Sequence, residues 1–153
     1  MKTLIDWAAV PHFGERLEMA RVLRPSAYAV LTDERGRVAI VFTSQGVFLP
    51  GGGIEADETP EQAVERETKE ECGLVVRLRP WPGTASQAVE LVYSKSEGIY
   101  FEKRCTFLRG TAVPLTSRPT ESGHVLRWVT PVSARLLLTP GSHRNALEQI
   151  QPA

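Results

Sequence analysis

Residues Gly52–Leu74 read GGIEADETPEQAVERETKEECGL, a glycine-rich turn joined to a short acidic helix. The start of the helix is well marked, because Thr59 is a good N-cap, Pro60 suits the first helical position and Gln62 completes a capping box. Gly73 is the expected stop signal. The stretch therefore predicts one short helix whose two ends are fixed by its own residues.

Three glutamates crowd one face of this helix. Glu67, Glu70 and Glu71 stand at positions i, i+3 and i+4, which a helix brings together. Like charges packed this closely repel each other, so a helix built only for stability would avoid them. A hard divalent cation removes the penalty, because Mg²⁺ and Mn²⁺ prefer oxygen ligands and are commonly paired with substrate phosphates. The glutamates are expected on the accessible side, beside a sheet-facing row of Val64, Thr68 and Cys72.

The spacing of the stretch resembles the Nudix box, G-x5-E-x7-R-E-U-x-E-E-x-G-U, in which U is a bulky aliphatic residue. Its positions are filled by Gly52, Glu58, Arg66, Glu67, Glu70, Glu71, Gly73 and Leu74. The first U is Thr68, whose methyl group can still pack inward. Coincidence is negligible for a motif of this length. The resemblance implies an α/β/α sandwich with a mixed β-sheet, of the α/β class. It also implies a hydrolase acting on acid anhydrides, which cleaves a nucleoside diphosphate derivative with water.

The same resemblance implies a metal site that holds Mg²⁺ or Mn²⁺. The implied ligands are the carboxylates of Glu67, Glu70 and Glu71 and the backbone carbonyl of Gly51. Arg66 is implied to orient the ligand carboxylates through charge-assisted hydrogen bonds. Glu58 is expected either to support the geometry of loop and helix or to serve a second metal. Glycines 51–53 suit such a site because they allow unusual dihedrals and close backbone approach.

The general base is less narrowly defined. Glu67 is the first choice, although Nudix enzymes also recruit a glutamate from outside the box. Glu121 is the best outside candidate, because it lies in a loop just before a predicted strand. Glu97 and Glu102 are weaker candidates.

The composition is that of an ordinary globular protein. The chain of 153 residues is 42% hydrophobic and 24% charged, with a formal net charge of zero. There is no overall basic field to recruit a nucleic acid polymer, whereas a small polyphosphate can arrive with its own metal. No apolar run approaches the ~20 residues of a membrane span, and no secretory signal is evident, so a cytoplasmic location is expected. The two cysteines, Cys72 and Cys105, lack the spacing of zinc ligands.

The remaining sequence predicts one domain over residues 1–153, with strands interleaved with helices. Residues 1–25 form a lead-in, a strand or short helix at a sheet edge, whose amphipathic patch stops at Pro25. Strands are expected at 27–31, 38–42, 47–49, 74–78, 88–93, 99–101 with 105–108, and 125–129. The segments 33–36 and 94–98 read as hairpin turns, and 50–53 as a glycine turn. Further helices are expected over 131–138 and from a Ser142 cap to residue 150.

Isolated aromatic and histidine residues are expected to be structural. For Tyr28 and Phe48, core packing is favoured over stacking on a nucleobase. Each of His12, His124 and His143 is isolated in the sequence, and a structural role is favoured over a catalytic one.

Several functions stay open at this level. Trp81–Gly83 followed by a long hairpin is compatible with a triphosphatase that removes oxidised nucleotides, whereas Pro82 stands too close to the box for the ADP-ribose pattern. Hydrolysis of ADP-ribose or a nucleotide sugar, nucleotide sensing without catalysis, and isoprenoid diphosphate isomerisation are the alternatives. Isomerisation has thin support, from Cys105 alone. The expected partner is a small nucleotide, with no membrane. The oligomeric state is open, and an edge strand or the N-terminal segment would allow a homodimer.

Overall fold

The structure, a computed structural model, describes residues 5–14, 21–79, 86–114 and 123–150. Its strands are β1 (His12–Gly14), β2 (Arg21–Thr32), β3 (Val38–Thr43), β4 (Gly46–Phe48), β5 (Gly51–Gly53), β6 (Leu74–Leu78), β7 (Ser86–Ser94), β8 (Ile99–Pro114) and β9 (Val125–Val129). Its helices are α1 (Pro60–Cys72), α2 (Pro131–Leu137) and α3 (Gly141–Gln149). None of the helices in these described ranges is long and apolar enough to span a membrane.

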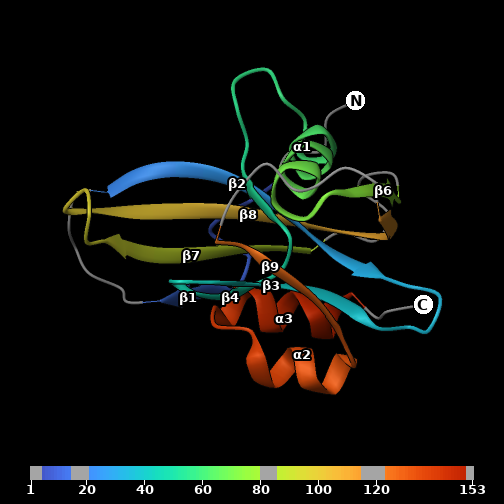
Figure 1. The fold of residues 1–153 in the computed structure, drawn as a ribbon. Helices are drawn as coiled ribbons and strands as arrows, with labels where there is room; N and C mark the ends of the chain where they lie inside the picture. The colour runs from blue at the N-terminus through green and yellow to red at the C-terminus, as the bar shows by residue number, and fades with distance from the viewer. Residues whose placement is uncertain (1–4, 15–20, 80–85, 115–122, 151–153) are drawn as a thin grey trace.

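The strands form one mixed, curled sheet (Figure 1). Its main path runs β1-β7-β8-β2-β3-β4, and β5, β6 and β9 pair with β2, β8 and β3. The centre of the sheet is the parallel pairing of β2 with β8, which extends from Arg21 opposite Tyr100 to Thr32 opposite Thr111. The β1–β7 pair is also parallel, whereas the other strand pairs of the described residues are antiparallel.

The alternation of residues along β2 divides the core into two layers. Ala27, Ala29 and Leu31 face one way and pack with Val64 of α1. The residues between them face the other way, where Tyr28 and Val30 pack in one cluster with Ala134 of α2 and Ala146 of α3. Helix α1 thus covers one face of the sheet and α2 with α3 the other, as Figure 1 shows. The predicted α/β/α sandwich with a mixed sheet is confirmed.

Most of the predicted elements are present. β2 and β3 form the expected hairpin, whose turn is held by Asp33, since its carboxylate accepts hydrogen bonds from the Arg35 and Arg37 amides. The segment 94–98 is a turn between β7 and β8, with Gly98 at a φ of 67°. β1 pairs with β7 at the end of the sheet path, which agrees with a lead-in strand at a sheet edge. The extent of the domain over residues 1–153 stays a prediction.

Three predictions about strands are wrong. Pro25 does not end the lead-in but lies inside β2, opposite Arg104 of β8, and its carbonyl accepts the Ile54 amide at 2.9 Å. The glycines 51–53 are not only a turn, because they form β5 against residues 26–28 of β2. The two segments expected at 99–101 and 105–108 are one strand, β8, because the charged residues between them are also paired with β2 and β7.

The start of the last helix also differs from the prediction. Ser142 is not its cap, because α3 begins at Gly141, with Pro140 at the N-cap position. The Ser142 hydroxyl and amide instead donate to Oε1 of the buried Glu90 on β7, at 2.8 Å and 3.1 Å. These bonds attach the start of α3 to the sheet. Trp81–Gly83, on which a substrate preference was based, lies outside the described residues.

Candidate active site

Helix α1 begins and ends where its sequence predicts. The Thr59 hydroxyl accepts the Gln62 amide, the Gln62 side chain accepts the Thr59 amide, and Gly73 closes the helix in the left-handed conformation at φ 64°. Thr68, at the position of the first aliphatic residue of the box, is fully buried. Its hydroxyl donates to the Val64 carbonyl at 2.7 Å, so its one polar group is satisfied within the helix. The buried face fixes how α1 lies on the sheet and therefore where its glutamates lie.

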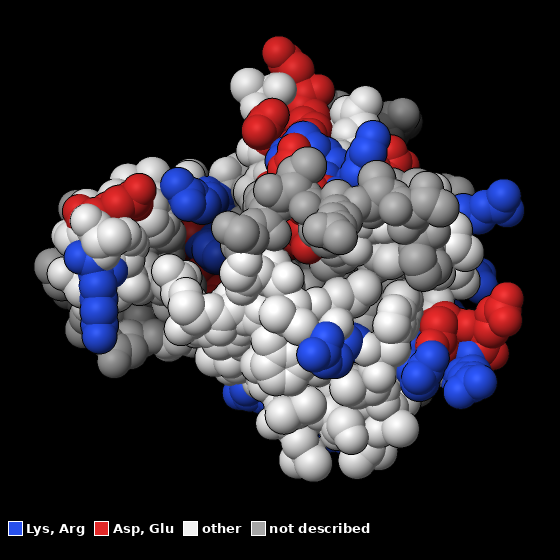
Figure 2. All heavy atoms as spheres, in the orientation of Figure 1, with Lys and Arg blue, Asp and Glu red and all other residues white. Residues whose placement is uncertain are grey.

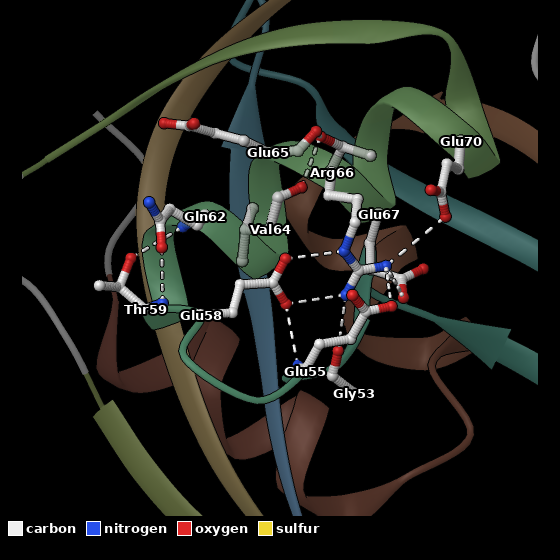
Figure 3. Close-up of polar contacts among 11 residues, drawn as sticks. Gly53, Glu55, Glu58, Thr59, Gln62, Val64, Glu65, Arg66, Glu67 and Glu70 are labelled. Carbon is white, nitrogen blue, oxygen red and sulfur yellow. Dashed lines mark hydrogen bonds and ion pairs between the residues drawn. The ribbon is translucent and has the colours of Figure 1, made fainter.

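Arg66 lies at the centre of the acidic residues (Figure 3). Its Nε and Nη2 donate to the two oxygens of Glu58 at 2.7 Å and 2.9 Å. Nη2 also donates to the Gly53 carbonyl at 2.9 Å, and Nη1 donates to Glu67 Oε1 at 2.9 Å. The Glu70 carboxylate lies 3.6 Å from Nη1. One planar guanidinium thus joins the glycine strand, the loop and the carboxylates of α1.

Glu58 is occupied by this network. Its pKa is lowered to about 2, because Arg66 and then the Glu55 amide donate hydrogen bonds to its carboxylate. The hydrogen bonds to Glu58 and then to Glu67 raise the pKa of Arg66, so the Arg66–Glu58 pair stays charged at neutral pH. Both Glu58 oxygens accept hydrogen bonds from Arg66. Of the two roles expected for Glu58, this arrangement favours support of the loop–helix geometry over binding of a second metal.

Glu71 faces a different environment from Glu67 and Glu70. Its side chain is buried, which contradicts the prediction that all three glutamates lie on the accessible side. Its Oε1 accepts the Gly51 amide at 3.0 Å, and its Oε2 lies 3.2 Å from Nδ1 of His124. Glu71 is buried because each residue of an α-helix is rotated by about 100° from the one before it. This rotation turns Glu71 away from the exposed side of Glu70 and toward β5.

Close packing explains two of the glycines. Gly51 has a φ of 144°, and a Cβ atom there would lie 2.1 Å from the Ala27 carbonyl oxygen. A Cβ on Gly52 would lie 2.7 Å from Cδ of Glu67. Glycine at these positions therefore lets β5 lie against β2 on one side and against a carboxylate of α1 on the other.

A family model described as the NUDIX domain matches residues 22–150, which is most of the chain. The chain belongs to the Nudix family. An RNA pyrophosphohydrolase from Marinomonas sp. is 45% identical to this chain over a segment that covers 33% of each protein. An 8-oxo-dGTP diphosphatase from Haemophilus influenzae is 53% identical over a segment that covers 21% of this chain and 24% of the relative. The matched segment thus spans a third or less of these curated relatives. A NUDIX hydrolase from Nitrosomonas europaea has the same fold, with a TM-score of 0.60 and 18% identity over 82% of this chain and 86% of its own.

Nudix hydrolases generally use a divalent metal such as Mg²⁺, and the donor chemistry of this site fits one. Its side chains offer carboxylate oxygens, which hard cations prefer. Across the described ranges, however, no three Asp, Glu, His or Cys side chains come close enough together to form a ready-made site. Arg66 holds Glu67, while the Gly51 amide and His124 hold Glu71. The assignment of Gly51, Glu67, Glu70 and Glu71 as ligands therefore stays a proposal.

The outside candidates for the general base in this Nudix domain lie in different places. Glu121 lies outside the described residues. Glu102 is held by two arginines, Arg21 at 3.3 Å and Arg104 at 2.8 Å. Glu97 lies in the β7–β8 turn. Glu67 stays the first choice among the described residues because it belongs to the Arg66 network.

A trough runs from Gly51 and Glu71 along part of the sheet face on which α3 packs. Its inner part, a cavity of about 410 Å³, is lined by Gly51, Glu71 and His124. Its outer part, of about 700 Å³, lies over β2, β7 and β8 beside the start of α3. Four residues line both parts: Tyr28, Gln45, Phe48 and Lys103. In Figure 2 basic and acidic side chains are visible in the hollow between the projecting end of the sheet and the rest of the molecule.

Sequence reasoning missed the roles of His124 and Lys103 in this trough. His124 stands in the segment before β9, close to the glutamate suggested as an outside base, which was a signal that this segment approaches the site. Lys103 lies two and four residues before the core residues Cys105 and Phe107 on β8. Because alternate residues of a strand share a face, its side chain lies on the same inward face as theirs. Tyr28 is a core residue as expected, stacked 5.7 Å from Phe107, but its hydroxyl also reaches the trough.

His143 is buried among the aromatic residues below the trough. Its Nδ1 accepts the Leu49 amide at 3.0 Å, and its ring lies 4.3 Å from the ring of Tyr28. Burial lowers the pKa of His143 to about 3, so the imidazole is neutral in the folded protein at neutral pH. This geometry agrees with a structural role.

The buried His143 predicts a loss of stability in mild acid. In the unfolded chain it takes up a proton near pH 6.5, whereas in the folded protein it does so only near pH 3, so stability falls as the pH drops below about 6.5. The contribution lost by pH 5 is about 2 kcal/mol. His143→Asn keeps an acceptor for the Leu49 amide but does not titrate, so its unfolding free energy is expected to fall less between pH 7 and pH 5. Urea denaturation at both pH values measures the difference. His12→Asn, at an exposed ring, is the control, and an equal pH dependence in all three proteins would contradict the prediction.

Gly52→Ala is expected to lower activity without unfolding the protein. The added Cβ displaces the Glu67 carboxylate from its bond with Arg66, and a misplacement of this size costs about 100-fold in turnover. Gly53→Ala is the matched control, because a Cβ there meets no atom within 4 Å, and its effect should be far smaller. Steady-state kinetics with thermal unfolding tests this. Equal activity of the two variants would show that the position of Glu67 does not matter.

Proposed function

We propose that this Nudix domain is a divalent-metal-dependent pyrophosphohydrolase that cleaves a phosphoanhydride bond in a nucleoside diphosphate derivative, with nucleoside triphosphates, oxidised ones included, as the first class to test. The observation that carries the proposal is the Arg66 network. It holds Glu67 and Glu58 and approaches Glu70, all beside the glycine strand. An arrangement built for stability alone would not concentrate carboxylates in this way, and Glu71 of the same helix lines the inner part of the trough.

The residues of the site divide the chemistry between them. The Glu67, Glu70 and Glu71 carboxylates and the Gly51 carbonyl would hold the metal, which when bound neutralises phosphate charge and lowers the pKa of water. Arg66 keeps Glu67 oriented, and Glu58 keeps Arg66 in place. Glu67 is the side chain that would accept the proton of the attacking water. Positioning and charge neutralisation are the main requirements of phosphoryl transfer, and these residues would supply the first directly and the second through the metal.

The outer part of the trough supports a nucleoside as the other half of the substrate. Its volume of about 700 Å³ lies in the range of small-molecule sites, and Tyr28, Phe48 and Phe101 give it aromatic walls. The two curated relatives are named for RNA and for 8-oxo-dGTP, so both deserve a place among the substrates tested.

A panel of substrates with Mg²⁺ or Mn²⁺ tests the proposal. It contains normal and oxidised nucleoside triphosphates, RNA with a 5′-triphosphate, ADP-ribose and a nucleotide sugar. Release of pyrophosphate and a nucleoside monophosphate is the expected result for the triphosphates. Preferential cleavage of ADP-ribose or the nucleotide sugar would instead assign the domain to the hydrolases of those compounds. Binding without metal-dependent cleavage of any compound would instead make the domain a nucleotide sensor and overturn the proposed activity.

A further inference from the structure

Lys103 lies where the two parts of the trough meet. It lines the inner part together with Gly51 and Glu71, and the outer part together with Phe101 and Tyr28. Its strand, β8, is the central strand of the sheet, paired with β2 along one side and with β7 and β6 along the other. The ammonium group is therefore held by the most firmly paired element of the fold, between the candidate metal ligands and the aromatic pocket.

Among the described residues, the Lys103 ammonium has one hydrogen-bond partner, the Tyr28 hydroxyl, and Glu90, which lies opposite it in the β7–β8 register, accepts its hydrogen bonds from Ser142. Nζ donates to the Tyr28 hydroxyl at 3.2 Å and lies 5.9 Å from the centre of the Tyr28 ring. No carboxylate among the described residues lies within ion-pair distance of it, whereas Glu102, the residue before it, holds both Arg21 and Arg104. Within the described part of the chain the phenol uses one of the three ammonium donors, so the other two can serve another group.

The protein keeps this partly buried ammonium charged. Burial is the largest single effect and lowers the pKa of Lys103, but the neighbouring Tyr28 and Cys105 together raise it, so the pKa lies above its ordinary value. A cation drawn partly out of water costs free energy unless an anion or several hydrogen bonds compensate it. A phosphate group supplies both, with a negative charge and several acceptor oxygens.

We infer that Lys103 is a substrate-binding residue that holds the phosphate chain between the carboxylates of α1 and the nucleoside pocket. The inference rests on the proposed function and extends it to how the substrate lies. The scissile phosphates occupy the inner part of the trough beside Gly51 and Glu71, and the nucleoside occupies the outer part. Tyr28 positions Lys103 through its hydroxyl and at the same time forms a wall of the pocket.

Lys103→Met tests this role, because methionine keeps the length and apolar stem of lysine but removes its charge. Binding of dGTP and of inorganic pyrophosphate is measured by calorimetry in EDTA, where no turnover occurs. Both dissociation constants are expected to rise by about 10- to 100-fold, the range for losing a hydrogen bond between charged groups. Their dependence on salt is expected to weaken as well. With the best substrate of the panel, KM should rise more than kcat falls.

Two further variants separate binding from structure. Arg77→Met removes a positive charge from an exposed residue of β6 that does not line the trough, and its affinities should match those of the wild type. Lys103→Arg keeps a cation and is expected to restore most of the lost affinity. If Lys103 only supported Tyr28, the methionine variant would lower the melting temperature and leave both dissociation constants unchanged, which would overturn the inference.

The outcomes also distinguish this inference from the proposed function. If the wild type binds pyrophosphate and dGTP but hydrolyses no compound of the panel, and Lys103→Met still weakens both, then the role of Lys103 holds and the hydrolase activity fails. If the wild type hydrolyses triphosphates and Lys103→Met leaves KM and both dissociation constants unchanged, then the activity holds and the role of Lys103 fails.

Discussion

Glu70→Gln is expected to reduce turnover by at least about 100-fold while leaving the protein folded, since it removes one negative oxygen ligand from the proposed metal site without changing its shape. The side chain is 41% exposed and its oxygen lies 3.6 Å from Arg66, so its contribution to stability is small. The unfolding free energy should change by no more than about 0.5 kcal/mol. Kinetics of the best substrate against Mg²⁺ concentration, together with urea denaturation, measures both quantities.

Glu65→Gln is the matched control for this change. Glu65 is an exposed residue of the same helix at a variable position of the box, so the same loss of charge there should leave kcat nearly unchanged. A Glu70→Gln protein that keeps full activity would contradict the assignment of Glu70 as a ligand. One that unfolds would show that the residue has a structural role.

Arg66→Lys is expected to affect both activity and stability. Lysine keeps the charge but cannot reach Glu58, Glu67 and the Gly53 carbonyl at once, because it lacks the planar fork of arginine. Turnover should fall by about 100-fold, as Glu67 loses its orientation. The melting temperature should fall by about 5 °C, since hydrogen bonds between charged groups are lost.

Arg37→Lys provides the comparison for Arg66→Lys. Arg37 also pairs with a carboxylate, at 2.7 Å from Asp33, but it lies in the β2–β3 hairpin and contacts no candidate site residue. Its substitution should lower stability slightly and leave kinetics unchanged. If Arg66→Lys behaves in the same way, the Arg66 network stabilises the loop and has no part in positioning Glu67.

Local signals in the sequence account for what could be predicted. Helix α1 was predicted at both ends, because Thr59 and Gly73 act through bonds to nearby residues and the ring of Pro60 fixes its own φ for the first helical turn. The box placed Arg66 beside Glu70 for a similar reason, since residues one turn apart on a helix meet regardless of the rest of the fold.

Features that depend on distant residues could not be predicted. β5 consists of three glycines, which carry no side-chain pattern, and it becomes a strand only because β2 lies beside it. The burial of Glu71 depends on the Gly51 amide and on His124, which the sequence separates from α1. The continuity of β8 through Glu102, Lys103 and Arg104 depends on backbone pairing with β2 and β7, which are distant in the sequence.

The long pairing of β2 with β8 has a consequence for how the protein folds. It joins residues as far apart as Arg21 and Tyr100, and Lys103 reaches Tyr28 only after this pairing has formed. Proteins dominated by contacts between distant parts of the chain fold slowly, in milliseconds to seconds. The chain loses the entropy of closing a long loop before the strand pairing stabilises it. During synthesis the ribosome releases α1 and its glutamates well before β8, so the nascent chain carries the acidic helix before the nucleoside pocket exists.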